Sequence, residues 1–325
     1  MTEQAKGPTQ NLVFAADLGG TNLRAATVDS EGKISSRVKY PTPHSAADAG
    51  EIVCAIVKAA NECKEAARKI GITISSASVV VPGTVDITGK IVVQAPNVPC
   101  LDGFRLSDAL GAQLGWPVLL ENDANAASMG ELWRGAARGC KTIICVTLGT
   151  GVGGGIIFNG QLWRGPDGSA GEIGHTTVDP FSGLKCKCGN TGCLELFASA
   201  TGIVRMAREA LPYYPKTILN AAQLNSQKIY EAGMQGDELA LATLKKMGTY
   251  LGIGLANLIN LLNPEMIVIG GGVANGWKLF EGYMHQEVEE RAFPLPVQRA
   301  RIVPAECGDD AGLLGAAHLA LSKNS

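Results

Sequence analysis

The chain has 325 residues, of which 46% are hydrophobic and 18% charged. This composition is that of an ordinary globular protein, with enough residues for two domains that each bury a core. The formal net charge is only −2 and the sequence pI is about 6.1, so bulk electrostatic binding to nucleic acid is not expected. No apolar run approaches the roughly 20 residues of a membrane span, and the first ten residues lack the apolar core of a secretory signal. A cytoplasmic location away from membranes is therefore predicted.

The first 100 residues predict a β-rich start followed by one helix. Residues 12–29 consist of an apolar run, a glycine turn and a second apolar run, which predicts a β-hairpin. A charged turn leads to a third strand, and residues 49–70 place apolar side chains on one helical face. Two further strands are expected at 77–81 and 90–94.

The middle of the chain repeats this opening. A strand at 117–121 runs directly into a helix that is expected to continue to about Arg138, with Asp123 or its neighbour as the N-cap. Residues 142–160 then follow the scheme of 12–29, with a strand, a glycine turn and a strand. This internal repeat, about 130 residues after the first copy, suggests two related domains.

The last third of the chain is mainly helical in its pattern. Leucine and methionine side chains recur at spacings of three and four from Leu244 to Leu262, which predicts a core-facing helix that ends at Asn263 and Pro264. The segment EMIVIGGG predicts another buried strand followed by a glycine turn, and a final helix is expected over about 311–322.

The glycine turns are candidate phosphate sites. Gly149, Gly151 and Gly154 satisfy the dinucleotide pattern GxGxxG, but a strand sequence follows them, whereas that fingerprint must open a helix. Exposed N–H groups of a glycine hairpin can still form an anion nest, with Thr21 or Thr150 adding a hydroxyl. The sequence contains no P-loop motif and no protein-kinase motif set. Asp17, just before the first turn, could position Mg²⁺ or its waters beside a phosphate.

Asp123 is the candidate base for phosphoryl transfer to a hydroxyl. Such a reaction needs positioning, charge neutralisation and one group that accepts the hydroxyl proton. Asp123 lies where a strand meets a helix, flanked by Asn122 and Asn125. The alternative, left open by the local pattern, is that Asp123 serves only as a helix cap.

Three cysteines within CKCGNTGCLE predict a metal site. Nine cysteines in all, several of them in apolar periodic segments, make a disulfide framework improbable, and a redox relay would normally show a CxxC pair. Cys186, Cys188, Cys193 and the preceding His175 form a complete donor set for structural zinc. A zinc site of this kind would hold the carboxylates of Glu172 and Glu195 at fixed positions, which suggests that they bind hydroxyl groups of a substrate. Zinc removal would then impair sugar binding before nucleotide binding.

Together these motifs resemble the ROK family of sugar kinases and repressors, over nearly the whole chain. The resemblance rests on DLGGTN at 17–22, VPGTVD at 81–86, ENDANA at 121–126, LGTGVGGG at 148–155, GEIGH at 171–175, the cysteine motif at 186–195, and IVIGGGVA at 267–274. It implies an α/β, actin-like (ASKHA, ribonuclease H-like) fold of two domains, each with a mixed five-stranded sheet. The expected domains are a small one at 10–121, with the C-terminal helix 311–325 packing back on it, and a large one at 122–310 carrying the zinc motif.

The resemblance also implies roles for individual residues. Asp123 matches the catalytic base. Residues that match sugar-binding positions are Gly83, Asn97, Asn122, Glu172, His175 and Glu195, with Asp123 itself at the reacting hydroxyl. Residues that match the nucleotide and phosphate loops are Asp17, Gly19, Gly20, Thr21, Asn22, Thr150, Gly151, Gly271 and Gly272. The zinc ligands are matched by His175, Cys186, Cys188 and Cys193.

Within the family these sequence motifs are most similar to those of the bacterial glucokinases. This implies ATP, carried with Mg²⁺, as phosphate donor to the 6-hydroxyl of glucose, and a homodimer or homotetramer. Other acceptors stay open, namely N-acetylmannosamine, N-acetylglucosamine, fructose and allose, as does polyphosphate as donor. A family repressor is disfavoured because about a dozen residues precede the first strand, too few for a helix-turn-helix domain. A chaperone-like or cytoskeletal ATPase would have no use for the sugar-facing carboxylates.

Overall fold

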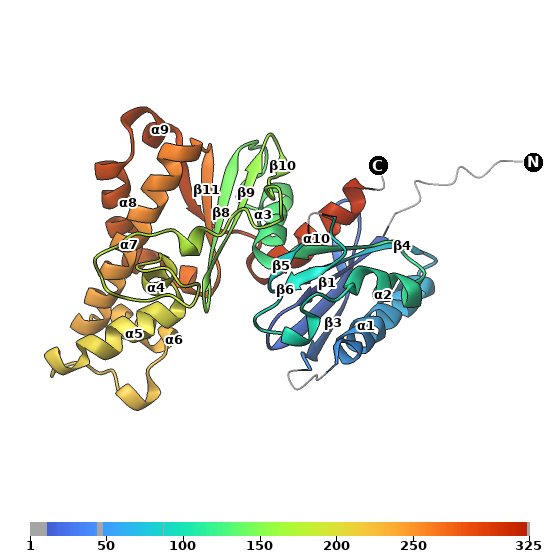
Figure 1. Cartoon of the computed structure of the whole chain (residues 1–325), viewed down its shortest axis with the longest axis horizontal. Helices are drawn as coiled ribbons and strands as arrows, with labels where there is room; N and C mark the ends of the chain where they lie inside the picture. The colour runs from blue at the N-terminus through green and yellow to red at the C-terminus, as the bar shows by residue number, and fades with distance from the viewer. Residues whose placement is uncertain (1–11, 44–47, 87, 324–325) are drawn as a thin grey trace, which may run out of the picture. The chain divides into compact units, whose positions relative to one another are not determined.

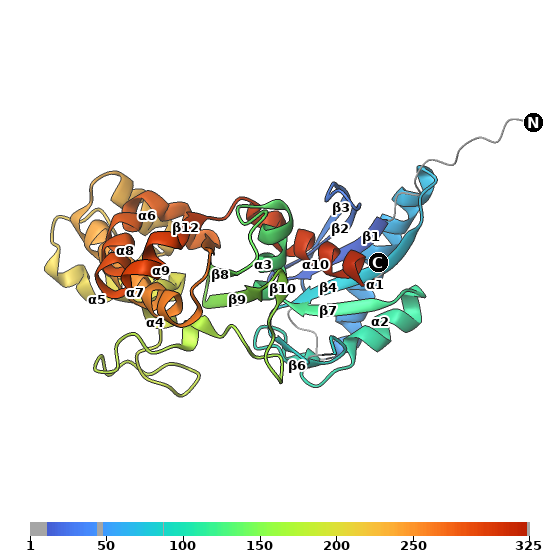
Figure 2. The same cartoon turned by 90° about the horizontal axis from the view of Figure 1, so that it is seen from above.

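The computed structural model describes residues 12–43, 48–86 and 88–323. Its contacts divide the chain into two compact units (Figures 1 and 2). The first comprises the described residues up to Arg138, the segment 162–170 and the chain from Asp309 onward; the second comprises 139–161 and 171–308. The sequence-based boundaries 10–121 and 122–310 stay a prediction.

The first unit is built on a five-stranded mixed sheet in the order β3-β2-β1-β4-β7. Its strands are β1 (Leu12–Leu18), β2 (Asn22–Val28), β3 (Ile34–Pro41), β4 (Ile74–Val81) and β7 (Val118–Asn122). β1 and β2 form the predicted antiparallel hairpin, while β4 runs parallel to both β1 and β7. Every residue of β1 is buried, as expected for a central strand covered on both faces.

Helices cover both faces of this sheet. On one face α1 (Ala49–Lys69) and α2 (Leu106–Leu114) share a core with alternate residues of β1, among them Phe14 and Leu18. On the other face α10 (Ala311–Ser322) contacts β1 and β4 and packs along α3 (Asp123–Arg134), as Figure 1 also shows. A small two-stranded sheet, β5 (Thr84–Val85) with β6 (Val92–Gln94), and the short helix η1 (Pro99–Leu101) complete the unit.

The second unit repeats the topology of the first. Its sheet has the order β10-β9-β8-β11-β12. The strands are β8 (Ile143–Leu148), β9 (Val152–Phe158), β10 (Gln161–Leu162), β11 (Met266–Gly270) and β12 (Arg301–Pro304). As in the first sheet, a central strand pairs antiparallel with the strand after its glycine turn and parallel with a later one. The predicted duplication is thus confirmed, and with it the mixed α/β architecture.

Helices of the second unit cover one face of its sheet with a single core. The long helix is α7 (Glu238–Leu262), and its stripe is buried at Leu244, Met247, Leu251 and Leu255, as the spacing predicts. Asn263 ends α7 in the left-handed conformation, with φ of 45°. The other helices are α4 (Glu195–Ala198), α5 (Ala200–Ala210), α6 (Ser226–Met234), α8 (Trp277–Arg291) and α9 (Pro294–Arg299), with short 3-10 helices η2 (Ile173–His175), η3 (Leu211–Tyr213), η4 (Ala221–Gln223) and η5 (Gly272–Gly276). The short helix η6 (Gly308–Asp310) lies where the chain returns to the first unit.

The predicted end of the helix after β7 is wrong. The helix that begins after β7 ends at Arg134, four residues before the expected Arg138. Gly135 leaves the helix in an extended conformation, and the residues after it form turns in which the backbone N–H groups of both Gly135 and Ala137 donate to the Glu131 carbonyl oxygen. Glycine is the weakest helix former after proline, so the chain exits there. No helix in the described part of the chain is long and apolar enough to cross a membrane.

Candidate active site and zinc site

Asp123 lies at the junction of β7 and α3, where it is exposed to solvent. The N-cap of α3 is Asn122, whose Oδ1 accepts the backbone N–H of Asn125 at 3.0 Å. Asp123 is therefore not the capping residue, although its Oδ1 accepts the N–H of Ala124 at 2.8 Å. The side-chain amide of Asn122 donates to the same Asp123 oxygen at 3.0 Å, which fixes the orientation of the carboxylate.

The electrostatic surroundings suit Asp123 to accept a proton. Although solvent reaches the side chain, protein atoms surround it on most sides, and this desolvation raises the pKa of Asp123 to about 6. The N–H of Ala124 acts in the opposite direction, while the negative charge of Asp17 raises the pKa further. A carboxylate with a pKa near 6 is ionised at neutral pH and is a stronger base than an ordinary aspartate.

The predicted sugar positions of the first unit meet around Asn122. Its Nδ2 donates to the carbonyl oxygen of Gly83 at 2.9 Å as well as to Asp123. A side chain at Gly83 would meet the carbonyl of Gln94, and the neighbouring loop carries Asn97, whose side chain lies against Gly20 of the first glycine turn. The structure therefore brings Gly83, Asn122 and Asp123 together, and brings Asn97 next to the first turn.

The first turn connects β1 to β2 over Gly19, Gly20 and Thr21. The N–H of Gly19 donates to the carbonyl of Asn22 at 2.9 Å. Asp17, at the end of β1, is buried, and burial raises its pKa although Arg24 counteracts this. Arg24 donates to Asp17 Oδ2 at 2.8 Å. Arg24 was not among the residues predicted from sequence, where a single arginine in a strand gives no signal.

The second turn connects β8 to β9 over Gly149, Thr150 and Gly151. The chain after the cysteine motif holds this turn in place: the N–H of Ala200 donates to Gly149 O at 2.8 Å, and Thr201 Oγ1 donates to Thr150 O at 2.9 Å. The third turn, with Gly271 and Gly272, follows β11 in the same unit. Gly271 has φ of +85° and approaches Leu148 at the end of β8, so the second and third turns are neighbours.

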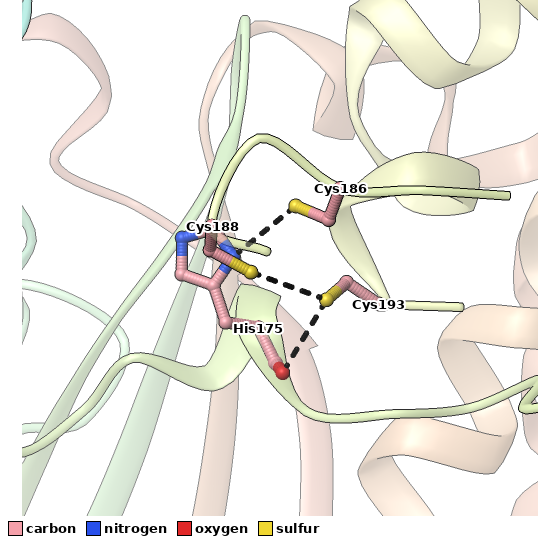
Figure 3. Close-up of side chains that lie close together, drawn as sticks. All are labelled: His175, Cys186, Cys188 and Cys193. Carbon is pink, nitrogen blue, oxygen red and sulfur yellow. Dashed lines mark hydrogen bonds between the residues drawn. The ribbon is translucent and has the colours of Figure 1, made fainter. Parts of the chain in front are cut away.

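The cysteine motif folds into a compact four-ligand cluster (Figure 3). Ligand atoms of His175, Cys186, Cys188 and Cys193 all lie within 4.8 Å of one another. His175 Nδ1 is 3.6 Å from Cys186 Sγ, and Cys188 Sγ is 3.7 Å from Cys193 Sγ. Gly192 lets the loop close, because its φ is +70° and a Cβ there would meet the Asp179 carbonyl at 1.8 Å.

The cluster fits tetrahedral zinc. With Zn–S near 2.3 Å and Zn–N near 2.0–2.1 Å, the tetrahedron edges are about 3.8 Å between sulfurs and about 3.6 Å between sulfur and nitrogen. The two distances above match these edges. Three thiols and one imidazole complete the coordination, which is the pattern of a structural site.

His175 faces the three cysteines and a carboxylate at once. Its Nδ1 points toward the sulfurs, while Nε2 lies 3.9 Å from Glu172 Oε2. Glu195, two residues after Cys193, begins α4, and its Oε2 accepts the N–H of Val152 at 3.0 Å. Glu172 thus lies beside a residue of the cluster, and Glu195 contacts the residue that follows the second glycine turn.

Comparison with known proteins identifies the family. The model described as "ROK family" matches residues 13–323. The chain belongs to the ROK family. A glucokinase of Halalkalibacterium halodurans is 37% identical over 310 residues, which cover 92% of each chain. The crystal structure of a ROK family glucokinase from Streptomyces griseus, in complex with glucose and AMPPNP, has a TM-score of 0.81 at 36% identity and covers 96% of this chain and 100% of that one.

A regulator is also similar to this ROK chain. The xylose repressor of Bacillus subtilis is 36% identical over 238 residues, which cover 72% of this chain and 58% of the repressor. The glucokinase matches therefore cover a larger share of this chain and of the relative than the repressor match does. The actin-like fold expected from the motifs is that of the ROK sugar kinases among these structural neighbours.

Proposed function

We propose that this ROK protein is a glucokinase, which transfers the γ-phosphoryl group of ATP to the 6-hydroxyl of glucose. The proposal rests on one observation above all: a solvent-accessible carboxylate, Asp123, oriented by Asn122 and with a pKa of about 6. The chain is also similar to glucokinases over 92% to 96% of its length.

In the proposed reaction Asp123 accepts the proton of the sugar hydroxyl. The hydroxyl oxygen attacks the γ-phosphorus in line, its bond to phosphorus forms as the bond to the β,γ-bridging oxygen breaks, and ADP leaves. Asn122 holds the Asp123 carboxylate, while Gly83 and Asn97 line the sugar site on the same unit. Glu172, His175 and Glu195 bind further hydroxyls.

The glycine turns bind the nucleotide phosphates in this proposal. Gly19, Gly20, Thr21 and Asn22 form the first phosphate loop, in which the N–H of Gly19 closes the turn by donating to the Asn22 carbonyl. Thr150 and Gly151 form the second loop, and Gly271 and Gly272 lie near the nucleotide. Mg²⁺ carried with ATP neutralises phosphate charge. Asp17 lies two residues before Gly19 of the first turn, and Arg24 donates to its Oδ2, so its Oδ1 is the oxygen that would accept a magnesium-bound water.

Zinc has a structural role here, held by His175 and the three cysteines. It would fix the loop that carries Glu172 and the start of α4 that carries Glu195. A homodimer or homotetramer in the cytoplasm, where ATP is available, completes the proposal and rests on the likeness to the family.

A coupled assay over a sugar panel tests this function. Glucose, fructose, allose, N-acetylglucosamine and N-acetylmannosamine are each offered with ATP or polyphosphate, and ADP release and sugar phosphate are measured. Glucose with ATP should give the highest kcat/KM. Turnover of another sugar but not of glucose would contradict glucose as the acceptor. Turnover only with polyphosphate would contradict ATP as the donor.

A further inference from the structure

Glu121, the residue before Asn122 in β7, is a buried carboxylate with four donors. Its side chain is 5% exposed. Arg164 donates to Oε2 twice, from Nε at 2.9 Å and from Nη2 at 2.5 Å. Asn125 Nδ2 and the backbone N–H of Asn122 donate to Oε1, at 3.0 and 3.1 Å. Both oxygens are thus occupied, and by groups from two different parts of the chain.

The groups on Oε1 are the ones that orient the proposed base. Asn122 contacts Asp123 through its side-chain amide, and it accepts the N–H of Asn125 through its Oδ1. Asn125 is 3% exposed, and its Nδ2 donates to Glu121. A continuous set of hydrogen bonds therefore runs from Arg164 through Glu121 to Asn122 and ends at the Asp123 carboxylate.

Arg164 comes from a separate segment of the chain. It lies two residues after β10, the edge strand of the second sheet, yet the segment 162–170 groups with the first unit by its contacts. A backbone hydrogen bond joins the two ends of the loop 164–170, because the Ala170 N–H donates to the Arg164 carbonyl at 3.0 Å. A planar guanidinium that donates two N–H groups to one carboxylate fixes that carboxylate in direction as well as in charge.

We infer that Arg164 is a positioning residue for phosphoryl transfer: by pairing with Glu121 it holds the network that sets the direction of the Asp123 carboxylate. The inference rests on the proposed role of Asp123 as base. Arg164 need not touch sugar or nucleotide. Its loss leaves Glu121 buried with half of its donors, so the carboxylate turns or draws in water, and Asn122 and Asn125 lose their fixed acceptor.

The test compares Arg164→Ala, Arg164→Lys and Glu121→Gln with the wild-type protein. Misdirection of the base should lower kcat about 10- to 100-fold in Arg164→Ala, with the glucose Kd, measured by calorimetry, changed less than about threefold. Arg164→Lys keeps the charge but not the paired N–H groups, so its kcat should lie between those of the wild type and Arg164→Ala. Added guanidinium ion at millimolar concentration should restore part of the kcat of Arg164→Ala. Arg105→Ala is the matched control, because it removes an exposed arginine–aspartate pair of the same unit at the start of α2.

Two results would overturn the inference. One is a kcat within twofold of wild type in folded Arg164→Ala. The other is a fall in thermal stability or in glucose affinity that accounts for all of the lost activity, without rescue by guanidinium. If Arg164→Ala does not fold, kcat and the glucose Kd are measured for Arg164→Lys and Glu121→Gln instead, and a kcat within twofold of wild type in both variants would again overturn the inference. Failure of the proposed function is separate, since it appears as absent sugar turnover in the wild-type protein.

Discussion

The carboxylate of Glu195 accepts the backbone N–H of Val152 at 3.0 Å. This bond joins the first residue of α4, which follows the cysteine motif, to the first residue of β9, directly after the second glycine turn. Two more hydrogen bonds, from Ala200 to Gly149 and from Thr201 to Thr150, support the same turn. A proposed sugar ligand is therefore attached to a proposed phosphate loop, and the two binding events should be thermodynamically coupled.

Substitution of Gly151 by alanine should expose this coupling. A Cβ at Gly151 would lie 2.4 Å from Glu195 Oε2, so the carboxylate must move away and its bond to Val152 breaks. Because a charge-assisted hydrogen bond is worth about 1.5–3 kcal/mol, we expect the KM values for ATP and glucose each to rise about 10-fold or more. The melting temperature should change little, because the displaced atom is the end of a flexible side chain.

Gly149→Ala provides the control for this experiment. Gly149 occupies the same turn, but a Cβ there meets no atom within 4 Å. Both KM values should stay within about threefold of the wild-type values. Equal effects of the two substitutions, or a rise in only one KM for Gly151→Ala, would count against the coupling through Glu195.

The pH dependence should report the raised pKa of Asp123. Because the base must be deprotonated to accept the hydroxyl proton, kcat/KM for glucose should rise with pH up to about 6 and then level off. The direction follows from desolvation, which favours the neutral acid, with the charge of Asp17 adding to it. Rates measured from pH 4.5 to 8, with circular dichroism to confirm the fold, check this. A rate that stays level down to pH 4.5 would mean that an ordinary aspartate, or no aspartate, limits the reaction.

Zinc should be present and should stabilise the second unit. Elemental analysis of purified protein is expected to give one zinc per chain. Cys188→Ser, which removes the exposed ligand of the cluster, should lower both zinc content and melting temperature. Cys54→Ser is the control, because Cys54 is an exposed thiol on α1 in the first unit. Full zinc content in Cys188→Ser would contradict the assigned ligand set.

Zinc removal should also affect both substrates. The sequence alone predicts an effect on sugar binding first, through Glu172 and Glu195. The contacts of Glu195, Ala200 and Thr201 with the second turn add an effect on ATP. Calorimetry of chelator-treated, still folded protein measures both ligands. Unchanged Kd values would leave the cluster with a role in stability alone.

Much of the fold follows from the sequence, because its signals are local. The repeated strand–glycine–strand pattern predicts both hairpins, and the spacing from Leu244 to Leu262 predicts α7. The cluster of His175 and three cysteines is predicted from the type and spacing of its side chains, because three thiols and an imidazole form a complete donor set for zinc. The end of α3 at Arg134 was missed, since the exit depends on the turns after Gly135.

The positioning network around the base could not be predicted from sequence. Glu121 and Arg164 are 43 residues apart, and neither belongs to a spacing pattern that indicates a partner. Their pairing depends on where the segment after β10 contacts the first unit. Similarly, the bond between Glu195 and Val152 requires the fold of the cysteine loop, since the contact joins residues that are again 43 positions apart.

The central claim, that Asp123 is the base of a glucose kinase, is tested most directly by Asp123→Asn. The amide keeps the shape of the side chain but cannot accept the hydroxyl proton. We predict that glucose 6-phosphate formation with ATP falls at least about 100-fold, in line with the usual contribution of a general base, while calorimetry shows glucose binding within about threefold of wild type. Formation of glucose 6-phosphate at the wild-type rate by folded Asp123→Asn protein would contradict the account.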